Sequence, residues 1–246
     1  MNILETLMDT LDFNTSVMDI RQGVFHTAVQ TRRVGLAATL PRDALRQDPP
    51  MVRKPGSLTD NSPKELAALA ASPRLLEAAM GMATINSLLS VDEDKCRELN
   101  AAHVIAEKGA DRDVAIVGHF PFIKKLRNQV NTLWVIENNP REGDLDAAQA
   151  DTVIPKADVV AITGTAMTNH TLDHLLSLCV PTAFVIMLGD TVPMSPVLFD
   201  FGVDALSGTV VVDPDLALKC VSQGANFRQI RGTRRLTMFK NGTSKM

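Results

Sequence analysis

The stretch DVAIVGHFPFIKKL, residues 113–126, is a short apolar segment that ends on Gly118 and continues into a turn with His119 and Pro121. From Asp113 onward, short apolar segments alternate with segments of helical pattern, which is typical of a doubly wound parallel sheet. The apolar segments are VAIVG, TLWVIE, ADVVAITG, TAFVIML and ALSGTVVV. The sequence therefore predicts the α/β fold class, with a doubly wound parallel sheet in residues 109–246.

The first part of the chain has a different pattern. Two stretches rich in β-branched and apolar residues, 16–31 and 32–40, are expected to form an antiparallel pair. Ser62-Pro63 and Ser72-Pro73 each place a hydroxyl at a helix N-cap and a proline at the first helical position. A further helix is expected over 94–108. We therefore predict a smaller α+β domain over residues 1–108.

The bulk composition excludes several function classes. With 25 basic and 28 acidic residues, a net charge of −3 and no tyrosine, the chain is a poor candidate for binding nucleic acid. Apolar runs such as TAFVIML are far shorter than the roughly 20 residues that cross a bilayer. The start, MNILETLMDTLDF, lacks a basic region before an apolar run, so we expect an amphipathic helix and a cytoplasmic protein. The three widely spaced cysteines encode no local disulfide or zinc motif.

In open α/β sheets, ligands bind beyond the carboxyl ends of the strands. The candidate site residues are therefore those that follow each apolar segment. They are unusually polar: the strand ends read Gly118-His119-Phe120-Pro121, Glu137-Asn138, Thr163-Gly164-Thr165 and Gly189-Asp190.

Glu137 follows Gly118 by about the spacing at which a dinucleotide-binding fold places the acid that holds a ribose hydroxyl. Bulky residues replace the glycine fingerprint after Gly118, so NAD is disfavoured and a nucleoside-like ligand stays open. His119 could ligate a metal or transfer a proton. An exposed strand-end carboxylate and a loop-bonded histidine are the alternatives for these two residues.

Thr163, Thr165, Thr168 and Asn169 cluster before a predicted helix, where hydroxyl groups and the helix dipole favour an anionic group. His170 and His174 have the spacing of a helical metal-binding pair. The apolar face of that helix turns both rings toward solvent, and no third ligand lies nearby, so we disfavour metal binding there. The basic stretch at the C-terminus, residues 226–246, is expected to be a solvated tail.

Several motifs together resemble a bacterial and archaeal family called the putative heavy-metal chelation domain. The resemblance covers nearly the whole chain. It rests on VGLA (34–37), GMATINSLL (81–89), GHFPF (118–122), the Glu137-Asn138 strand end, ITGTAMTNHT (162–171) and LGDTVPMSPVLFDFGVDALSGTVVVDP (188–214). It implies a small domain similar to the enolase N-terminal fold packed on a Rossmann-like domain, with the active site in the cleft between them. It also implies the handling of a metal or a metallocofactor.

The residues within these motifs define our candidate site. His119 and Glu137 are the expected metal ligands or proton-transfer groups. The expected ligand-binding residues are Asn86, Gly118, Phe120, Pro121, Asn138, Thr163, Gly164, Thr165, Asn169, Thr171, Gly189 and Pro193.

Three functions remain open from the sequence. The first is binding of a divalent or heavy-metal ion, or of a metal-chelating small molecule or metallocofactor, in the interdomain cleft. The second is an enzyme, a transferase or lyase, that acts on a nucleotide-like or pterin-like cofactor there. The third is an oligomeric binding module, with a homodimer expected, whose proline-rich loop 41–61 contacts a partner. Because the strand ends carry one histidine and no cysteine, a soft metal would arrive already bound to a small molecule.

Overall fold

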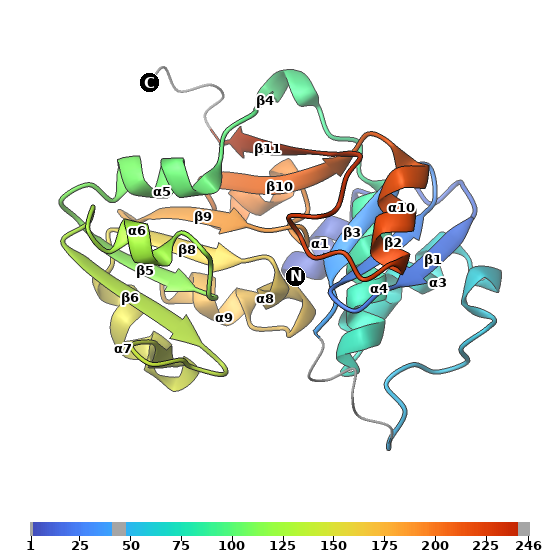
Figure 1. Ribbon diagram of the computed structural model, residues 1–246, viewed down its shortest axis with the longest axis horizontal. Coiled ribbons are helices and arrows are strands. Elements are labelled where there is room, and N and C mark those ends of the chain that lie inside the picture. The colour runs from blue at the N-terminus through green and yellow to red at the C-terminus, as the bar shows by residue number, and fades with distance from the viewer. Residues whose placement is uncertain (1, 41–47, 241–246) are drawn as a thin grey trace.

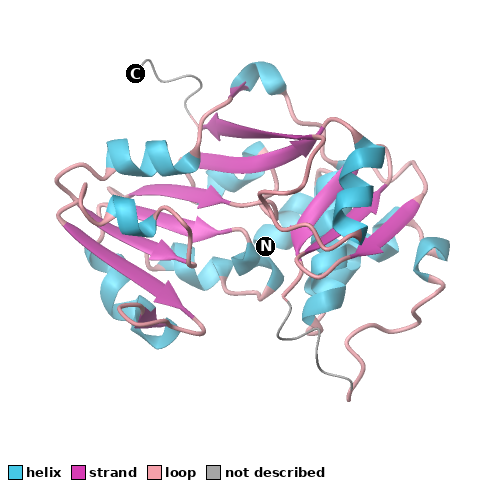
Figure 2. Cartoon of the chain, in the orientation of Figure 1, coloured by secondary structure: helices cyan, strands magenta, loops and turns pink. Residues whose placement is uncertain are grey.

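The computed structural model describes residues 2–40 and 48–240. They form an α/β fold with an eight-stranded mixed sheet and a three-stranded antiparallel sheet (Figures 1 and 2). The predicted fold class is confirmed. Among the described residues, none of the helices has the length and apolarity that a membrane span needs.

The large sheet has the strand order β4-β11-β10-β9-β8-β5-β6-β7. Its six parallel strands, taken in chain order, are arranged 3-2-1-4-5-6, which is the doubly wound Rossmann order. The order reverses between β5 and β8, so the carboxyl ends of these two strands define the switch point. The parallel strands are β5 (Asp113–Val117), β6 (Thr132–Glu137), β7 (Leu145–Asp146), β8 (Val159–Thr163), β9 (Phe184–Leu188) and β10 (Ala205–Val211).

Two antiparallel strands extend this sheet at one edge. β11 (Thr233–Phe239) pairs with β10, and the short β4 (Cys96–Arg97) pairs with β11. β11 lies within the basic stretch expected to be a solvated tail, and that expectation was wrong for residues 233–239. The second half of the stretch, with Leu236, Thr237 and Met238, is buried, so these residues are part of the packed sheet.

Helices cover both faces of the large sheet, and the alternation of strand residues decides which face each contacts. Val114 and Ile116 of β5 pack in one apolar cluster, and Ala115 packs in another. The first cluster includes residues of α5 (Ala101–Lys108) and α6 (Ile123–Leu126). The second includes residues of α7 (Ala150–Val153), α8 (Thr165–Thr168), α9 (Leu172–Ser177) and the 3-10 helix η6 (Pro196–Phe201).

The small sheet is a three-stranded meander, where the sequence predicted two strands. The first strand-like stretch folds back on itself at Gly23, whose backbone N–H donates to the His26 carbonyl at 2.8 Å. The strands are β1 (Asp19–Gln22), β2 (His26–Gln30) and β3 (Val34–Ala38). The helices of the same part of the chain are α1 (Ile3–Asp9), α3 (Pro63–Ala68) and α4 (Leu75–Leu88), and α4 packs on β2 and β3.

Helix α10 (Pro214–Ser222), which follows the parallel strands of the large sheet, packs against the small sheet (Figure 1). Ala28 and Leu36 form an apolar cluster with Ala217 and Val221 of α10. The alternate residue Val29 faces the other way, into the cluster that contains α4 residues. The small sheet is therefore enclosed by one helix from its own part of the chain and one from the far part.

The two predicted domains also exchange elements in the other direction. β4 and α5 lie within residues 1–108, yet β4 is a strand of the large sheet and α5 contacts β8 and β9. The helix expected over 94–108 is α5 alone, capped by Asn100, because residues 93–97 form a 3-10 turn and β4 instead. The large sheet thus begins at Cys96. The predicted boundary after residue 108 therefore assigns β4 and α5 to the small domain, although both pack with the large sheet.

Of the two helix starts predicted in the small unit, one is confirmed and the other lies later in the chain than predicted. Ser62 caps α3 in a capping box with Glu65. The second helix begins at Leu75, two residues late. The Ser72 hydroxyl donates to the carboxylate of Glu77 at 2.6 Å and accepts the Arg74 backbone N–H at 3.1 Å, so it is bonded just before the helix. Part of the proline-rich loop, residues 41–47, lies outside the described residues. The remainder is tied to α4 by an ion pair between Arg53 and the buried Glu77.

Candidate functional site

A cavity of about 600 Å³ lies at the carboxyl ends of the central strands. The large sheet contributes His119, Thr163 and Gly189 to its wall, and the small sheet contributes His26 and Ala38. The cavity is therefore formed between the two sheets, at the switch point where the strand order predicts a ligand.

A second cavity of about 250 Å³ lies beside it, at the end of β6. The two cavities share four lining residues, His119, Phe120, Thr163 and Thr165. Together they contain all the candidate site residues except Asn86 and Pro193. The smaller cavity contains Gly118, Glu137, Asn138, Asn169 and Thr171, and the larger one contains Pro121, Gly164 and Gly189.

Gly118 turns the chain into this site with a φ of 111°, in the region that side-chain-bearing residues avoid. A Cβ atom at this position would lie 3.0 Å from the Phe120 ring and 3.1 Å from Cβ of Thr163. The glycine therefore permits both the turn and the close approach of the loops that follow β5 and β8.

His119 is held by a buried carboxylate. Its Nδ1 atom lies 2.9 Å from Oδ2 of Asp144, whose side chain is only 3% exposed and also accepts the Arg141 backbone N–H. Nε2 of His119 makes no hydrogen bond to the described residues. A carboxylate behind one ring nitrogen is the arrangement that orients metal-binding and proton-transferring histidines. The sequence did not point to Asp144, which lies in a loop seven residues after Glu137.

Glu137 is the last residue of β6, and its side chain makes no hydrogen bond or ion pair to the residues that the structure describes. It lines the smaller cavity together with His119. Within residues 2–40 and 48–240, no group of three His, Cys, Asp or Glu side chains is arranged to hold a metal ion. A metal at His119 or Glu137 would therefore need further ligands from water or from a small molecule.

The threonine and asparagine residues after β8 form a hydroxyl-rich wall. Thr163 and Thr165 have their hydroxyl oxygens 3.0 Å apart, and the Asn169 side chain lies 2.8 Å from the Thr171 hydroxyl. Thr168 is different, because it is fully buried and its hydroxyl has no partner within the described chain. Three members of the predicted polar cluster thus line the cavities, and Thr168 does not.

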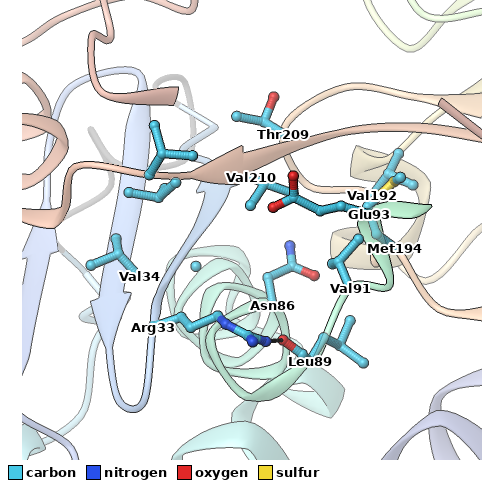
Figure 3. A pocket seen from close by; sticks show the side chains of 13 residues that line it. Arg33, Val34, Asn86, Leu89, Val91, Glu93, Val192, Met194, Thr209 and Val210 are labelled. Atoms are coloured by element: carbon cyan, nitrogen blue, oxygen red, sulfur yellow. Dashed lines mark hydrogen bonds between the residues drawn. The ribbon is translucent and has the colours of Figure 1, made fainter. Parts of the chain in front are cut away.

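Asn86 and Pro193 lie outside both cavities. The Asn86 amide donates to the carbonyl of Leu36 at 2.8 Å and to that of Thr191 at 3.2 Å. It points into a separate cavity of about 120 Å³ between β3 and β10 (Figure 3). Asn86 therefore joins the small sheet to the loop after β9, and Pro193 is buried in that same loop.

His26 and Asp190 form a second histidine–carboxylate pair that the sequence analysis did not predict. Nε2 of His26 lies 2.8 Å from Oδ2 of Asp190, and the Thr209 hydroxyl donates to Oδ1 at 2.5 Å. Burial raises the pKa of Asp190, but the hydrogen bonds from His26 and Thr209 and the nearby charges of His26 and Arg235 outweigh it and lower the pKa below its ordinary value. The carboxylate is therefore ionised within the wall of the larger cavity.

Four phenylalanines give the larger cavity an aromatic wall: Phe25, Phe120, Phe122 and Phe227. The Phe120 and Phe122 rings are stacked, with centroids 5.4 Å apart, and pack with the core of the large sheet. Arg228 and Arg235 also line this cavity. Both come from the basic stretch that the sequence suggested was a tail, and the only signal that could have found them is its excess of basic residues.

The His170–His174 pair does not form. His170 precedes α9 with a φ of 61°, and its Nε2 atom lies 2.9 Å from the Ser72 carbonyl oxygen. His174, on α9, lies 2.7 Å from the exposed carboxylate of Asp151. The four-residue spacing therefore does not place the two rings one helical turn apart, because only His174 is on the helix.

Two family models, DUF364 and DUF4213, match residues 100–240 and 4–89, and both are described as "Putative heavy-metal chelation". An uncharacterized protein of Methanocaldococcus jannaschii is 28% identical over 162 residues, which is 63% of this chain and 62% of that protein. The match thus spans less than two thirds of that relative.

Two solved structures are similar to the whole chain. A protein of unknown function from Desulfitobacterium hafniense aligns with a TM-score of 0.81 and 24% identity, over 97% of both chains. One from Pyrococcus horikoshii aligns with a TM-score of 0.79 and 20% identity, over 96% of this chain and 98% of that one. Both are DUF364 family proteins, and at this identity they show the fold. The DUF364 model matches residues 100–240, which is more than half of the chain. The chain therefore belongs to the family described as putative heavy-metal chelation.

Proposed function

We propose that the protein binds a metal ion together with a small organic chelator in the two connected cavities, with His119 and Glu137 contacting the metal. The observation that carries this proposal is the position of His119. Its ring lines both cavities, Asp144 holds Nδ1, and Nε2 has no partner among the described residues.

The dimensions of the site support an organic ligand. Small-molecule sites are typically apolar clefts of about 300–1,000 Å³ with a few placed polar groups. The larger cavity, at about 600 Å³ with its aromatic wall, falls in this range. A bare ion, with ligand atoms about 2.0–2.6 Å away, would leave most of this space unused.

The cysteines support the same conclusion, since soft metals favour thiolate ligands. None of the three cysteines lines either cavity. Burial, together with nearby acidic residues, raises the pKa of Cys96 and of Cys179 to about 11. Both thiols therefore stay protonated at neutral pH, and the softer ligands would come from the bound molecule.

A second candidate function is an enzyme, a transferase or lyase, that acts on a nucleotide-like or pterin-like cofactor in the same cleft. The observation that favours it is the Rossmann strand order with Glu137 at the end of the second strand of that order. In dinucleotide-binding folds an acid at this position accepts hydrogen bonds from a ribose hydroxyl. Glu137 would then bind the organic molecule and not the metal.

Native mass spectrometry with elemental analysis on untagged protein separates these functions. The variants are His119→Ala, Glu137→Gln and, as a matched control, His103→Ala, because His103 is exposed on α5 and lines neither cavity. Chelation predicts a stoichiometric metal that both site variants lose and the control keeps. A metal-free organic mass that only Glu137→Gln loses would favour the enzyme instead, and a metal retained by both site variants would contradict chelation at this cleft.

The same spectra report the oligomeric state. We propose a homodimer, supported by the exposure of Met18, Val24 and Phe25 in and beside the β1–β2 hairpin. A monomer at micromolar concentration would contradict it.

A further inference from the structure

Two arginines at the larger cavity, Arg228 and Arg235, form no ion pair with any carboxylate that the structure describes. Arg235 lies on β11 directly opposite Thr209 of β10, so both side chains point to the same face of the sheet. Thr209 donates to Asp190 on that face, which places Arg235 on the cavity side. The Arg235 guanidinium makes one hydrogen bond, from Nη2 to the Phe227 carbonyl at 2.8 Å, and no ion pair within the described chain. Four of its five N–H donors therefore stay available.

The preceding residue provides an internal comparison. Arg234 points to the opposite face of β11, where Glu98 and Glu93 accept its hydrogen bonds at 2.7 and 2.5 Å. Adjacent arginines on one strand thus have different surroundings: Arg234 is bonded to two carboxylates, and Arg235 is bonded to none within the described chain, although Asp190 lines the same cavity. The lack of a partner at Arg235 is specific to the cavity face.

Arg228 brings a second cation to the same place. Both guanidinium groups lie over the Phe227 ring, with centroid distances of 5.4 Å for Arg228 and 5.3 Å for Arg235. The turn that carries Phe227 and Arg228 is closed by its own hydrogen bonds, from Arg228 N–H to the Asn226 side chain and from Asn226 N–H to the Gln229 side chain. The guanidinium of Arg228 makes no hydrogen bond to any described residue. Two like charges are therefore held near each other by a shared aromatic ring.

The remaining charges of the cavity do not neutralise this pair. Asp190 is the only carboxylate among the described lining residues, and its oxygens are already committed to His26 and Thr209. The site thus has an excess of positive charge, although the whole chain carries a net charge of −3. A guanidinium presents donors in a planar fork that matches the oxygens of a carboxylate or phosphate.

We propose that Arg228 and Arg235 form an oxyanion subsite, so that the ligand of the cleft is a planar ring compound that bears a phosphate or carboxylate group. The ring would pack against the stacked Phe120 and Phe122, and the oxyanion would bind the two guanidinium groups. The inference rests on the small-molecule cleft proposed above and specifies the chemical class of its ligand.

Isothermal titration calorimetry with three simple probes tests this subsite: phenyl phosphate, benzoate and the neutral benzamide. The wild-type protein should bind at least one of the two anions more tightly than benzamide, and the tighter one identifies the group. Arg235→Gln and Arg228→Gln should each weaken that anion about tenfold, the loss expected for one charge-assisted hydrogen bond. Arg235→Lys should retain part of the affinity because it keeps the charge.

Arg234→Gln is the matched control and should leave all three affinities unchanged. The proposal is overturned if neither anion binds at 10 mM, if benzamide binds as well as both anions, or if Arg234→Gln weakens the anion as much as Arg235→Gln does. Because both cavity arginines are exposed, thermal unfolding should show that the variants keep their fold.

The outcome is separable from that of the metal proposal. Anion binding that depends on Arg228 and Arg235, in a protein that carries no metal, would keep the subsite and reject chelation. A bound metal that His119→Ala loses, in a protein that binds none of the anionic probes, would keep chelation and reject the subsite.

Discussion

His26 Nε2 and Asp190 Oδ2 lie 2.8 Å apart and connect the small sheet to the large one across the wall of the main cavity. His26 belongs to β2, and Asp190 follows β9. Both side chains are nearly buried, at 6% and 12% exposure. The backbone N–H of Ala38 adds a parallel connection, to the Thr191 hydroxyl at 2.9 Å. These two hydrogen bonds therefore hold the two sheets together across the wall of the cavity.

Replacing this carboxylate should cost stability in a pH-dependent way. We expect Asp190→Asn to lower the free energy of unfolding at pH 7 by about 2 kcal/mol, as for hydrogen bonds to a buried charge. The pKa of Asp190 is lowered in the folded state, so its contribution is complete above the ordinary aspartate pKa of about 4 and is lost as pH falls through the folded value. Urea unfolding between pH 7 and 3 should show the gap to wild type narrowing with acid.

The exposed Asp151→Asn is the control for that series, and it should change stability little at any pH. An Asp190→Asn deficit that stays constant from pH 7 to pH 3 would contradict a role for the ionised carboxylate.

Asp144→Asn should weaken metal binding without unfolding the protein. Asp144 orients the His119 ring and favours the tautomer with an available Nε2 atom. Loss of such a supporting carboxylate typically costs about 10–100-fold in metal affinity. Zn²⁺ titration calorimetry would measure it, with Glu142→Gln, an exposed neighbour in the same loop, as the control. Equal affinities for wild type and Asp144→Asn would mean that His119 does not bind the metal.

The thiols should be slow to react and unnecessary for metal binding. With a pKa of about 11 for Cys96 and Cys179, only about one thiol in 10,000 is ionised at pH 7. Alkylation by iodoacetamide, followed by mass spectrometry, should accelerate about tenfold per pH unit from 7 to 10. A variant with all three cysteines changed to serine should retain its metal. Loss of the metal from this variant would mean that cysteine thiolates of the protein, and not the bound molecule, supply the soft ligands.

Gly118→Ala should disturb both folding and ligand binding. An alanine at this φ costs about 1–2 kcal/mol, and its methyl group would press on Phe120 and Thr163. Gly143→Ala is the matched control, because Gly143 also has a positive φ but would place its Cβ in open space. We expect Gly118→Ala to be the less stable of the two in chemical denaturation and to lose the bound molecule. Equal stabilities would show that the close approach to Phe120 is unimportant.

The sequence predicted the large sheet well because buried parallel strands are continuous apolar runs. The segments after Asp113 have that pattern, and the structure places each of them in a strand. β11 was missed because Arg234 and Arg235 stand next to each other in it, and charges on both faces of an edge region obscure the strand period. The two-residue strand β4 was missed because it is too short to have a period at all.

Most of the candidate site residues could be predicted because ligands bind at the carboxyl ends of parallel strands, and those ends can be located from the sequence alone. The same rule could not find Asp144, His26 or Arg235. Asp144 reaches His119 from a loop, His26 reaches the larger cavity from the second sheet, and Arg235 reaches it from the antiparallel strand β11. All three positions depend on long-range packing. Asn86 and Pro193 had motif support alone, and the structure places them in the connection between the sheets.

The position of α10 has a consequence for how this chain is synthesised. One apolar face of the small sheet, with Ala28, Val34 and Leu36, is covered by residues 217–221. On the ribosome, the first 90 residues emerge long before that cover exists, so the small sheet has no complete core until nearly the whole chain has been translated. A ribosome stalled after residue 200 should therefore display the β1–β3 segment in a protease-sensitive form, and the two units should acquire protection in one step.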